Sequence, residues 1–126
     1  MNAALVFVGA GLGGVLRHAA TLAAARLLGP AFPWGTLAVN VSGSLLMGLV
    51  VGWLSLRAGE AWSGPARLFL ATGLCGGFTT FSAYSLDAVG LWERGATGLA
   101  AAYAAGSVVG SIAALGLGLA AARALA

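Results

Sequence analysis

Hydrophobic residues fill four long stretches of the chain, at roughly residues 3–28, 34–57, 67–93 and 96–122. Charged residues and short connectors rich in glycine and proline separate these stretches, as at Gly29-Pro30, 59–65 and Gly95. The hydrocarbon core of a bilayer is about 30 Å thick and takes ~20 helical residues to cross. The pattern therefore predicts an all-α integral membrane protein, with four transmembrane helices forming one domain over residues 1–126.

The composition agrees with a membrane location. Of the 126 residues, 60% are hydrophobic and only 7% are charged, whereas soluble domains are about a quarter charged. So few charges cannot cover a water-facing surface, which argues against a soluble enzyme. The four tryptophans fall at or near the ends of the stretches, where an aromatic belt would lie: Trp34, Trp53, Trp62 and Trp92.

The basic residues are all arginines, and they are scattered. They are Arg17, Arg26, Arg57, Arg67, Arg94 and Arg123. They form no basic patch, so we expect no nucleic-acid partner. Apart from Arg17, which interrupts the first stretch, four spans place three of them on the side of the termini and two on the other side, which sets no firm orientation by the positive-inside rule. Either one arginine suffices to orient the chain, or copies insert both ways and pair antiparallel.

Small residues recur at a spacing of four in three stretches. They are Gly9 and Gly13 in the first, Asn40, Ser44, Gly48 and Gly52 in the second, and Ala102, Gly106, Gly110, Ala114 and Gly118 in the fourth. Small residues let helix backbones approach closely in lipid. These stripes predict a tight bundle and say nothing of an activity.

Polar residues inside the spans are more informative, because each needs a partner or water. Tyr103, Ser107 and Ser111 recur every four residues and share one helix face. The serines either bond back to their own helix or form a polar track that faces water or an ion. Asn40 cannot satisfy its amide within its own helix, so it is either an interhelical hydrogen-bonding residue or a pore-lining donor.

The third stretch contains an unusual segment from Gly73 to Ser85. Its glycines and the adjacent Thr79 and Thr80 make a poor helix, so we predict a break near residues 75–80. Unwound backbone at membrane depth must be buried or must bind something, and it often forms an ion site; a glycine-rich packing kink is the alternative. Phe81 and Tyr84 then share a face, and the positive edges of their rings can solvate a small anion.

Three segments resemble the motifs of the Fluc (CrcB) family of fluoride channels: residues 13–17, 35–44 and, most specifically, 73–85. The resemblance covers essentially the whole chain. It implies a multi-pass protein of the plasma (inner) membrane that exports fluoride passively and is not an enzyme. It also implies an antiparallel, dual-topology homodimer with two pores, whose partners are fluoride, lipid and a second copy of the chain.

The resemblance also assigns roles to residues of this sequence. The pore aromatics fall on Phe81 and on Tyr84, where the family has a second phenylalanine. The other expected pore residues are Asn40, Thr80, Tyr103, Ser107 and Ser111. Arg17 would draw anions into a vestibule, and Asp87 would lie near the other mouth. One structural Na⁺ per dimer would bind the main-chain carbonyls of Gly76 and Thr79, which are suitable hard ligands.

Two other functions stay open. A small multidrug exporter shares the four spans and the dual topology, but it needs a membrane-buried carboxylate, and the only acids are Glu60, Asp87 and Glu93, all near span ends. A structural membrane subunit without transport is compatible with the glycine stripes. An enzyme is the weakest interpretation, since His18 beside Arg17 has no buried carboxylate or cysteine in view.

Overall fold

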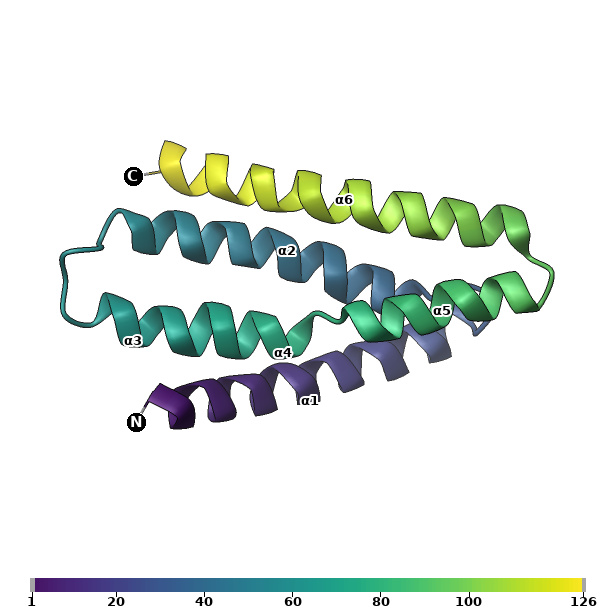
Figure 1. Cartoon of the computed structure of the whole chain (residues 1–126), viewed down its shortest axis with the longest axis horizontal. Helices are drawn as coiled ribbons and strands as arrows, with labels where there is room; N and C mark the ends of the chain where they lie inside the picture. The colour runs from purple at the N-terminus through teal and green to yellow at the C-terminus, as the bar shows by residue number, and fades with distance from the viewer. Residues whose placement is uncertain (1, 126) are drawn as a thin grey trace.

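The structure is a computed structural model that describes residues 2–125, and it is a bundle of long, roughly antiparallel helices (Figure 1). Three are continuous, apolar and long enough to cross a membrane: α1 (Asn2–Leu28), α2 (Trp34–Ser55) and α6 (Thr97–Ala124). The remaining pass is assembled from α3 (Ser63–Arg67), η1 (Leu68–Cys75), α4 (Gly76–Phe78) and α5 (Phe81–Glu93). Four passes with an interrupted third are thus confirmed, with limits within a few residues of those predicted.

The connectors lie where the sequence places them. Both termini and the α2–α3 connector lie at one end of the bundle, and the α1–α2 and α5–α6 connectors lie at the other (Figure 1). Gly29 and Gly95 turn the chain at that second end with φ of 80°, a conformation that glycine adopts without steric cost. The structure therefore keeps the division counted from the sequence, with three arginines toward the end that holds the termini and two toward the other end.

The interrupted pass contains a feature that the sequence did not reveal. Residues Leu68–Cys75 form a π-helix, which is wider than an α-helix because each N–H bonds five residues back. This segment and α4 lie against α1, where a side chain on Gly13 would overlap the Leu74 carbonyl oxygen. The close approach explains the buried Gly9 and Gly13 of the first stripe.

The helix breaks at two residues. Thr79 (φ −85°, ψ 158°) and Thr80 (φ −153°, ψ 117°) are extended, inside the predicted window of 75–80. Thr80 then caps α5, because its Oγ1 accepts a hydrogen bond of 3.1 Å from the Ala83 N–H. The break is therefore a defined structural element and not a bend within a continuous helix.

The glycine stripes of α2 and α6 form the closest helix pair, but only over part of their length. The Cα of Gly118 lies 3.1 Å from where a Cβ on Gly48 would be, and a Cβ on Gly52 would meet Ala122. Contrary to expectation, Ala102 is exposed and nothing lies within 4 Å of a Cβ built on Gly106. A spacing of four drifts around an α-helix by about 40° at each step, so a long stripe cannot face one partner throughout.

This contact yields a first prediction. Gly48→Ala would drive a methyl group into the Leu115 carbonyl oxygen and the backbone of Gly118. Overpacking of this kind costs about 1–3 kcal/mol, and we expect a lower unfolding temperature in detergent. Gly116→Ala is the matched control, because open space lies beside Gly116; equal unfolding temperatures for the two variants would contradict the prediction.

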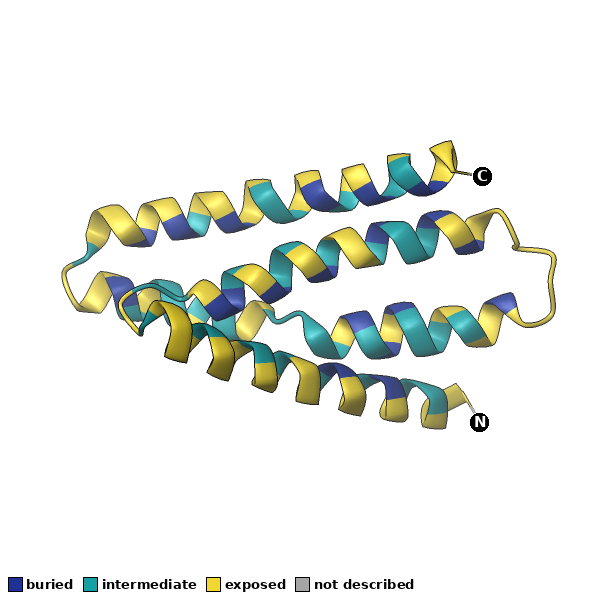
Figure 2. Cartoon of the chain, turned by 180° about the vertical axis from the view of Figure 1, so that it is seen from behind, coloured by how far each residue is buried: buried dark blue, intermediate teal, exposed yellow. Residues whose placement is uncertain are grey.

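The outer faces of the bundle are apolar. Figure 2 shows exposed residues along the length of α1 and α6, and they include Phe7 at 81%, Ile112 at 70% and Leu117 at 67% exposure. Apolar surface on this scale marks contact with lipid or with another protein. It agrees with a membrane location and leaves room for a second copy.

Candidate functional site

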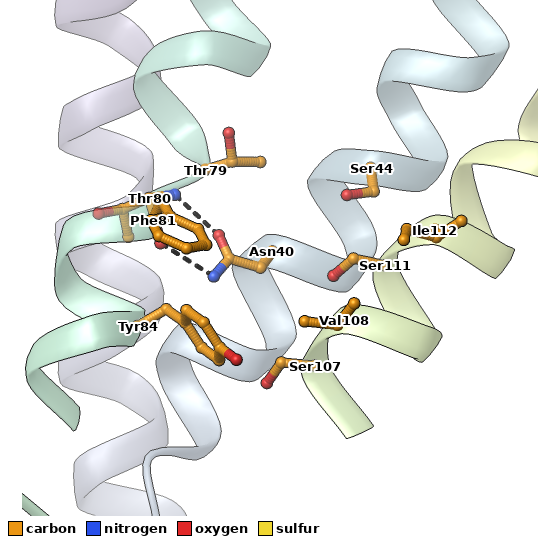
Figure 3. Close-up of a pocket in the computed structure, with 10 residues that line it drawn as sticks. All are labelled: Asn40, Ser44, Thr79, Thr80, Phe81, Tyr84, Ser107, Val108, Ser111 and Ile112. Carbon is orange, nitrogen blue, oxygen red and sulfur yellow. Dashed lines mark hydrogen bonds between the residues drawn. The ribbon is translucent and has the colours of Figure 1, made fainter. Parts of the chain in front are cut away.

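A pocket of about 290 Å³ opens at the break in the third pass. It lies between α2, the break, α5 and α6 (Figure 3). Its lining consists of amide, hydroxyl, aromatic and aliphatic side chains: Asn40, Ser44, Thr79, Thr80, Phe81, Tyr84, Ser107, Val108, Ser111 and Ile112. None of these side chains is charged. The structure thus brings six of the predicted pore residues together: Asn40, Thr80, Phe81, Tyr84, Ser107 and Ser111.

Asn40 clamps the break from the neighbouring helix. Its Nδ2 donates to the Thr80 carbonyl at 3.0 Å, and its Oδ1 accepts from the Thr80 N–H at 2.7 Å (Figure 3). Of the two predicted roles, the interhelical hydrogen bond is present. An amide nitrogen carries two N–H donors, however, and Asn40 also lines the pocket. One N–H therefore stays available for a ligand while the other holds the backbone.

The break diverts two N–H groups from their helical partners. In a continuous helix, the Thr80 N–H would donate to the Gly76 carbonyl and the Ala83 N–H to the Thr79 carbonyl. Here the first donates to Asn40 and the second to the Thr80 hydroxyl. The Gly76 and Thr79 carbonyls thereby lose their helical donors, and they are the two that the family resemblance implies as cation ligands. Gly76 is also exposed on the single chain.

Two aromatic residues of α5, Phe81 and Tyr84, line the pocket, with ring centroids 5.3 Å apart. Phe81 is 77% exposed on the single chain. The Tyr84 hydroxyl donates to the Ala104 carbonyl of α6 at 2.9 Å. The hydroxyl that distinguishes Tyr84 from a phenylalanine therefore ties its ring to the opposite helix, and the ring stays within the pocket.

Ser107 is the most unusual of the hydroxyl residues. It is 4% exposed, and its Oγ has no hydrogen-bond partner within residues 2–125. Ser42 and Ser85, in contrast, donate to carbonyls of their own helices, as membrane serines often do. A buried polar group without a partner is costly. A free hydroxyl in the same pocket as Asn40 and Tyr84 (Figure 3) is thus a donor for a bound ion or water.

Three lining residues were not predicted as site residues: Ser44, Val108 and Ile112. Ser44 was assigned to a packing stripe, although its position one turn after Asn40 could have indicated the pocket. Val108 and Ile112 carry no polar group. Only the location of the pocket between α2 and α6 shows that they take part.

Tyr103 departs from its predicted place, because it does not line the pocket. It is 1% exposed, and its hydroxyl donates to Asp87 Oδ2 at 3.2 Å. Asp87 lies six residues before the end of α5 at Glu93. It lines a second cavity of about 240 Å³, together with Phe32, Thr36 and Arg94.

Arg17 lines neither of these two cavities. It lies on α1 one helical turn after Gly13, which contacts the backbone of α4. Arg17 is partly exposed, and the neighbouring His18 is exposed. In a single chain Arg17 thus lies outside both cavities, and its vestibule role stays a prediction.

The break also affects the electrostatic potential at the pocket. Phe81 begins α5, so the positive end of a 13-residue helix faces the site. Hydroxyl and amide donors, aromatic rings and a helix N-terminus can solvate an anion without a fixed countercharge. An interrupted membrane span with such a pocket defines a small helical membrane protein that handles an ion at membrane depth.

Comparison with known proteins gives the family. The sequence pattern of the CrcB-like protein, Camphor Resistance (CrcB), matches residues 4–119. The chain is 56% identical over 125 residues to "Fluoride-specific ion channel FluC" of Methylobacterium nodulans, covering 98% of this chain and 97% of the relative. Proteins of the same description from Mesorhizobium japonicum and Rhodopseudomonas palustris are 55% and 54% identical, and each match covers 98–99% of both chains. The chain belongs to the CrcB family.

Proposed function

We propose that the protein is a fluoride-specific ion channel that exports cytoplasmic fluoride across the plasma membrane. The observation that carries this proposal is the uncharged pocket at the helix break, where a buried Ser107 hydroxyl has no protein partner. The relatives that match over nearly their full length carry the name of a fluoride channel. A channel of this kind needs no catalytic group.

The pocket suits a small, strongly hydrated anion. A narrow path must replace the water around fluoride with donors, and Asn40, Ser107 and Ser111 supply them from two helices. The ring edges of Phe81 and Tyr84 add positive potential without a full charge. Because no arginine lines the site, binding stays weak enough for the ion to leave, as conduction requires.

Export needs no energy source of its own. Hydrogen fluoride enters cells as a neutral molecule, and its anion is trapped when it dissociates inside. A negative membrane potential then drives the anion outward through a passive pore. The protein therefore needs only a path that selects fluoride.

A fluoride-electrode assay on liposomes tests the function. Liposomes that hold the purified protein should release fluoride and retain chloride. Equal release of both ions would reject selectivity, and retention of both would reject the channel. Ethidium efflux from cells that express the protein would instead favour a multidrug exporter, and unchanged fluoride tolerance after gene deletion would favour a subunit without transport.

Loss of the free hydroxyl should slow conduction. We expect Ser107→Ala to lower fluoride efflux about tenfold, because a hydrogen bond to an ion contributes roughly 1.5–3 kcal/mol. The Ser42→Ala variant is the control, since Ser42 bonds to its own helix at Ala38. Equal efflux rates for the two variants would remove Ser107 from the path.

We also propose that the channel is an antiparallel homodimer of oppositely inserted copies. The three-to-two balance of arginines supports it, as do the exposed Gly76 and Phe81, which a partner would cover. Single cysteines in the two end connectors, Gly59→Cys and Gly95→Cys in a Cys75→Ala background, test it. Both should react with an impermeant thiol reagent added outside intact cells. Reaction of only one would establish a single orientation.

A structural Na⁺ at the dimer axis fits the residues at the break. The Gly76 and Thr79 carbonyls have lost their helical donors, and carbonyl oxygens are suitable ligands for a hard cation. Among residues 2–125 no cluster of His, Cys, Asp or Glu could hold a metal, so the main chain would supply the ligands. Replacement of Na⁺ by choline should lower the unfolding temperature of the dimer, and an unchanged temperature would contradict the site.

A further inference from the structure

The two cavities share two helices, α2 and α5. Thr36 on α2 and Asp87 on α5 line the second cavity, and Asn40 and Tyr84, about one turn away on the same helices, line the first. On α6, Ser107 lines the first cavity, and Tyr103 lies about one turn before it. Tyr103 lines neither cavity but lies between them, in contact with residues of both. It forms the partition that separates the pocket at the break from the connector end of the bundle.

The Tyr103 ring is held from three sides. Its hydroxyl donates to Asp87 at 3.2 Å, and the Tyr84 ring lies 5.3 Å from it on the side of the first pocket. On the other side, Phe32 of the α1–α2 connector meets it edge to face, with centroids 5.5 Å apart and an interplanar angle of 88°. This perpendicular geometry is a favoured arrangement for an aromatic pair.

Phe32 is itself fixed in place although it lies in a connector. Its ring packs 4.6 Å from the Trp34 ring at the start of α2. The guanidinium of Arg94 donates to the carbonyl of the preceding residue, Ala31, at 3.0 Å. The connector is thereby tied to the end of α5, so Phe32 forms a rigid support behind Tyr103.

We propose that Phe32 is a positioning residue for the pore, which holds the Tyr103 ring across the route between the two cavities and so contributes to halide selectivity. This inference rests on the proposed fluoride channel. An ion that passes from one cavity to the other must move past the partition. With Phe32 behind it, the ring leaves a path only for the smallest halide. Without Phe32 the ring can swing toward the connector, and a larger anion can follow.

The test compares the rates of chloride and fluoride release from liposomes. Phe32→Ala should raise the ratio of chloride to fluoride release about three- to tenfold, the effect expected from loss of one edge-to-face contact. Phe32→Tyr, which keeps the aromatic edge, should retain the wild-type ratio. Phe7→Ala removes a phenylalanine of α1 that is 81% exposed, and it should also leave the ratio unchanged.

Several results would overturn the inference. A Phe32→Ala protein that elutes normally and keeps the wild-type ratio would do so, as would a Phe32→Tyr protein that leaks chloride like the alanine variant. Should Phe32→Ala fail to fold, Phe32→Leu preserves bulk without the aromatic edge; a raised ratio then supports the inference, and a wild-type ratio rejects it. Absence of fluoride release from the wild type would instead reject the proposed function itself.

Discussion

Phe81→Ile should abolish fluoride efflux while leaving the assembly of the protein intact. Isoleucine fills a similar volume but has no ring, so the pocket loses an aromatic side chain and its positive edge. Phe81 is 77% exposed on the single chain, and its side chain makes no hydrogen bond, so the fold does not depend on it. We expect the release of fluoride to fall to the leak of protein-free liposomes, and size-exclusion chromatography should give the wild-type profile.

The matched control is Phe7→Ile, which makes the same exchange at an exposed site on α1. It should conduct like the wild type. Wild-type efflux from Phe81→Ile would remove Phe81 from the conduction path. The proposal that ring edges solvate the anion would then rest on Tyr84 alone.

Asn40→Leu should cost both stability and conduction. The variant leaves the Thr80 N–H and carbonyl without their partners at 2.7 and 3.0 Å, and each unsatisfied buried group costs about 1–3 kcal/mol. It also removes the second N–H of an amide that lines the pocket. We expect a marked drop in the unfolding temperature in detergent and loss of fluoride efflux from the fraction that stays folded.

Asn40→Asp separates the two effects. Its carboxylate keeps the acceptor for the Thr80 N–H but loses the donor and places a negative charge in the pocket. It should therefore remain better folded than Asn40→Leu and still fail to conduct fluoride. Efflux at the wild-type rate from either variant would show that Asn40 serves the fold alone.

The sequence predicted the passes well because lipid imposes simple rules on composition. Three of the four long apolar stretches became continuous helices with limits near those expected, and the break came where glycines and threonines interrupt the third. Regular spacing also placed Tyr103, Ser107 and Ser111 on one face. These features depend on local sequence, which periodicity and helix propensity describe.

The features that escaped prediction depend on tertiary contacts. The π-helix at Leu68–Cys75 has no distinctive sequence pattern, and the loss of contact along the Gly106 stripe follows from the drift of a four-residue spacing. The burial of Tyr103 away from the pocket reflects its bond to Asp87 and the presence of Phe32. Partners that lie 16 and 71 residues from Tyr103 in the chain cannot be inferred from spacing alone.

The clamp between Asn40 and Thr80 has a consequence for biosynthesis. The two residues are 40 positions apart, and α2 leaves the ribosome well before the interrupted pass does. The Asn40 amide is thus already in the membrane when Thr80, whose backbone it bonds, arrives. If α2 is inserted before the interrupted pass, the Thr80 backbone groups can bond to Asn40 as soon as they enter the membrane. The insertion machinery would then not release unpaired peptide groups into the hydrocarbon core.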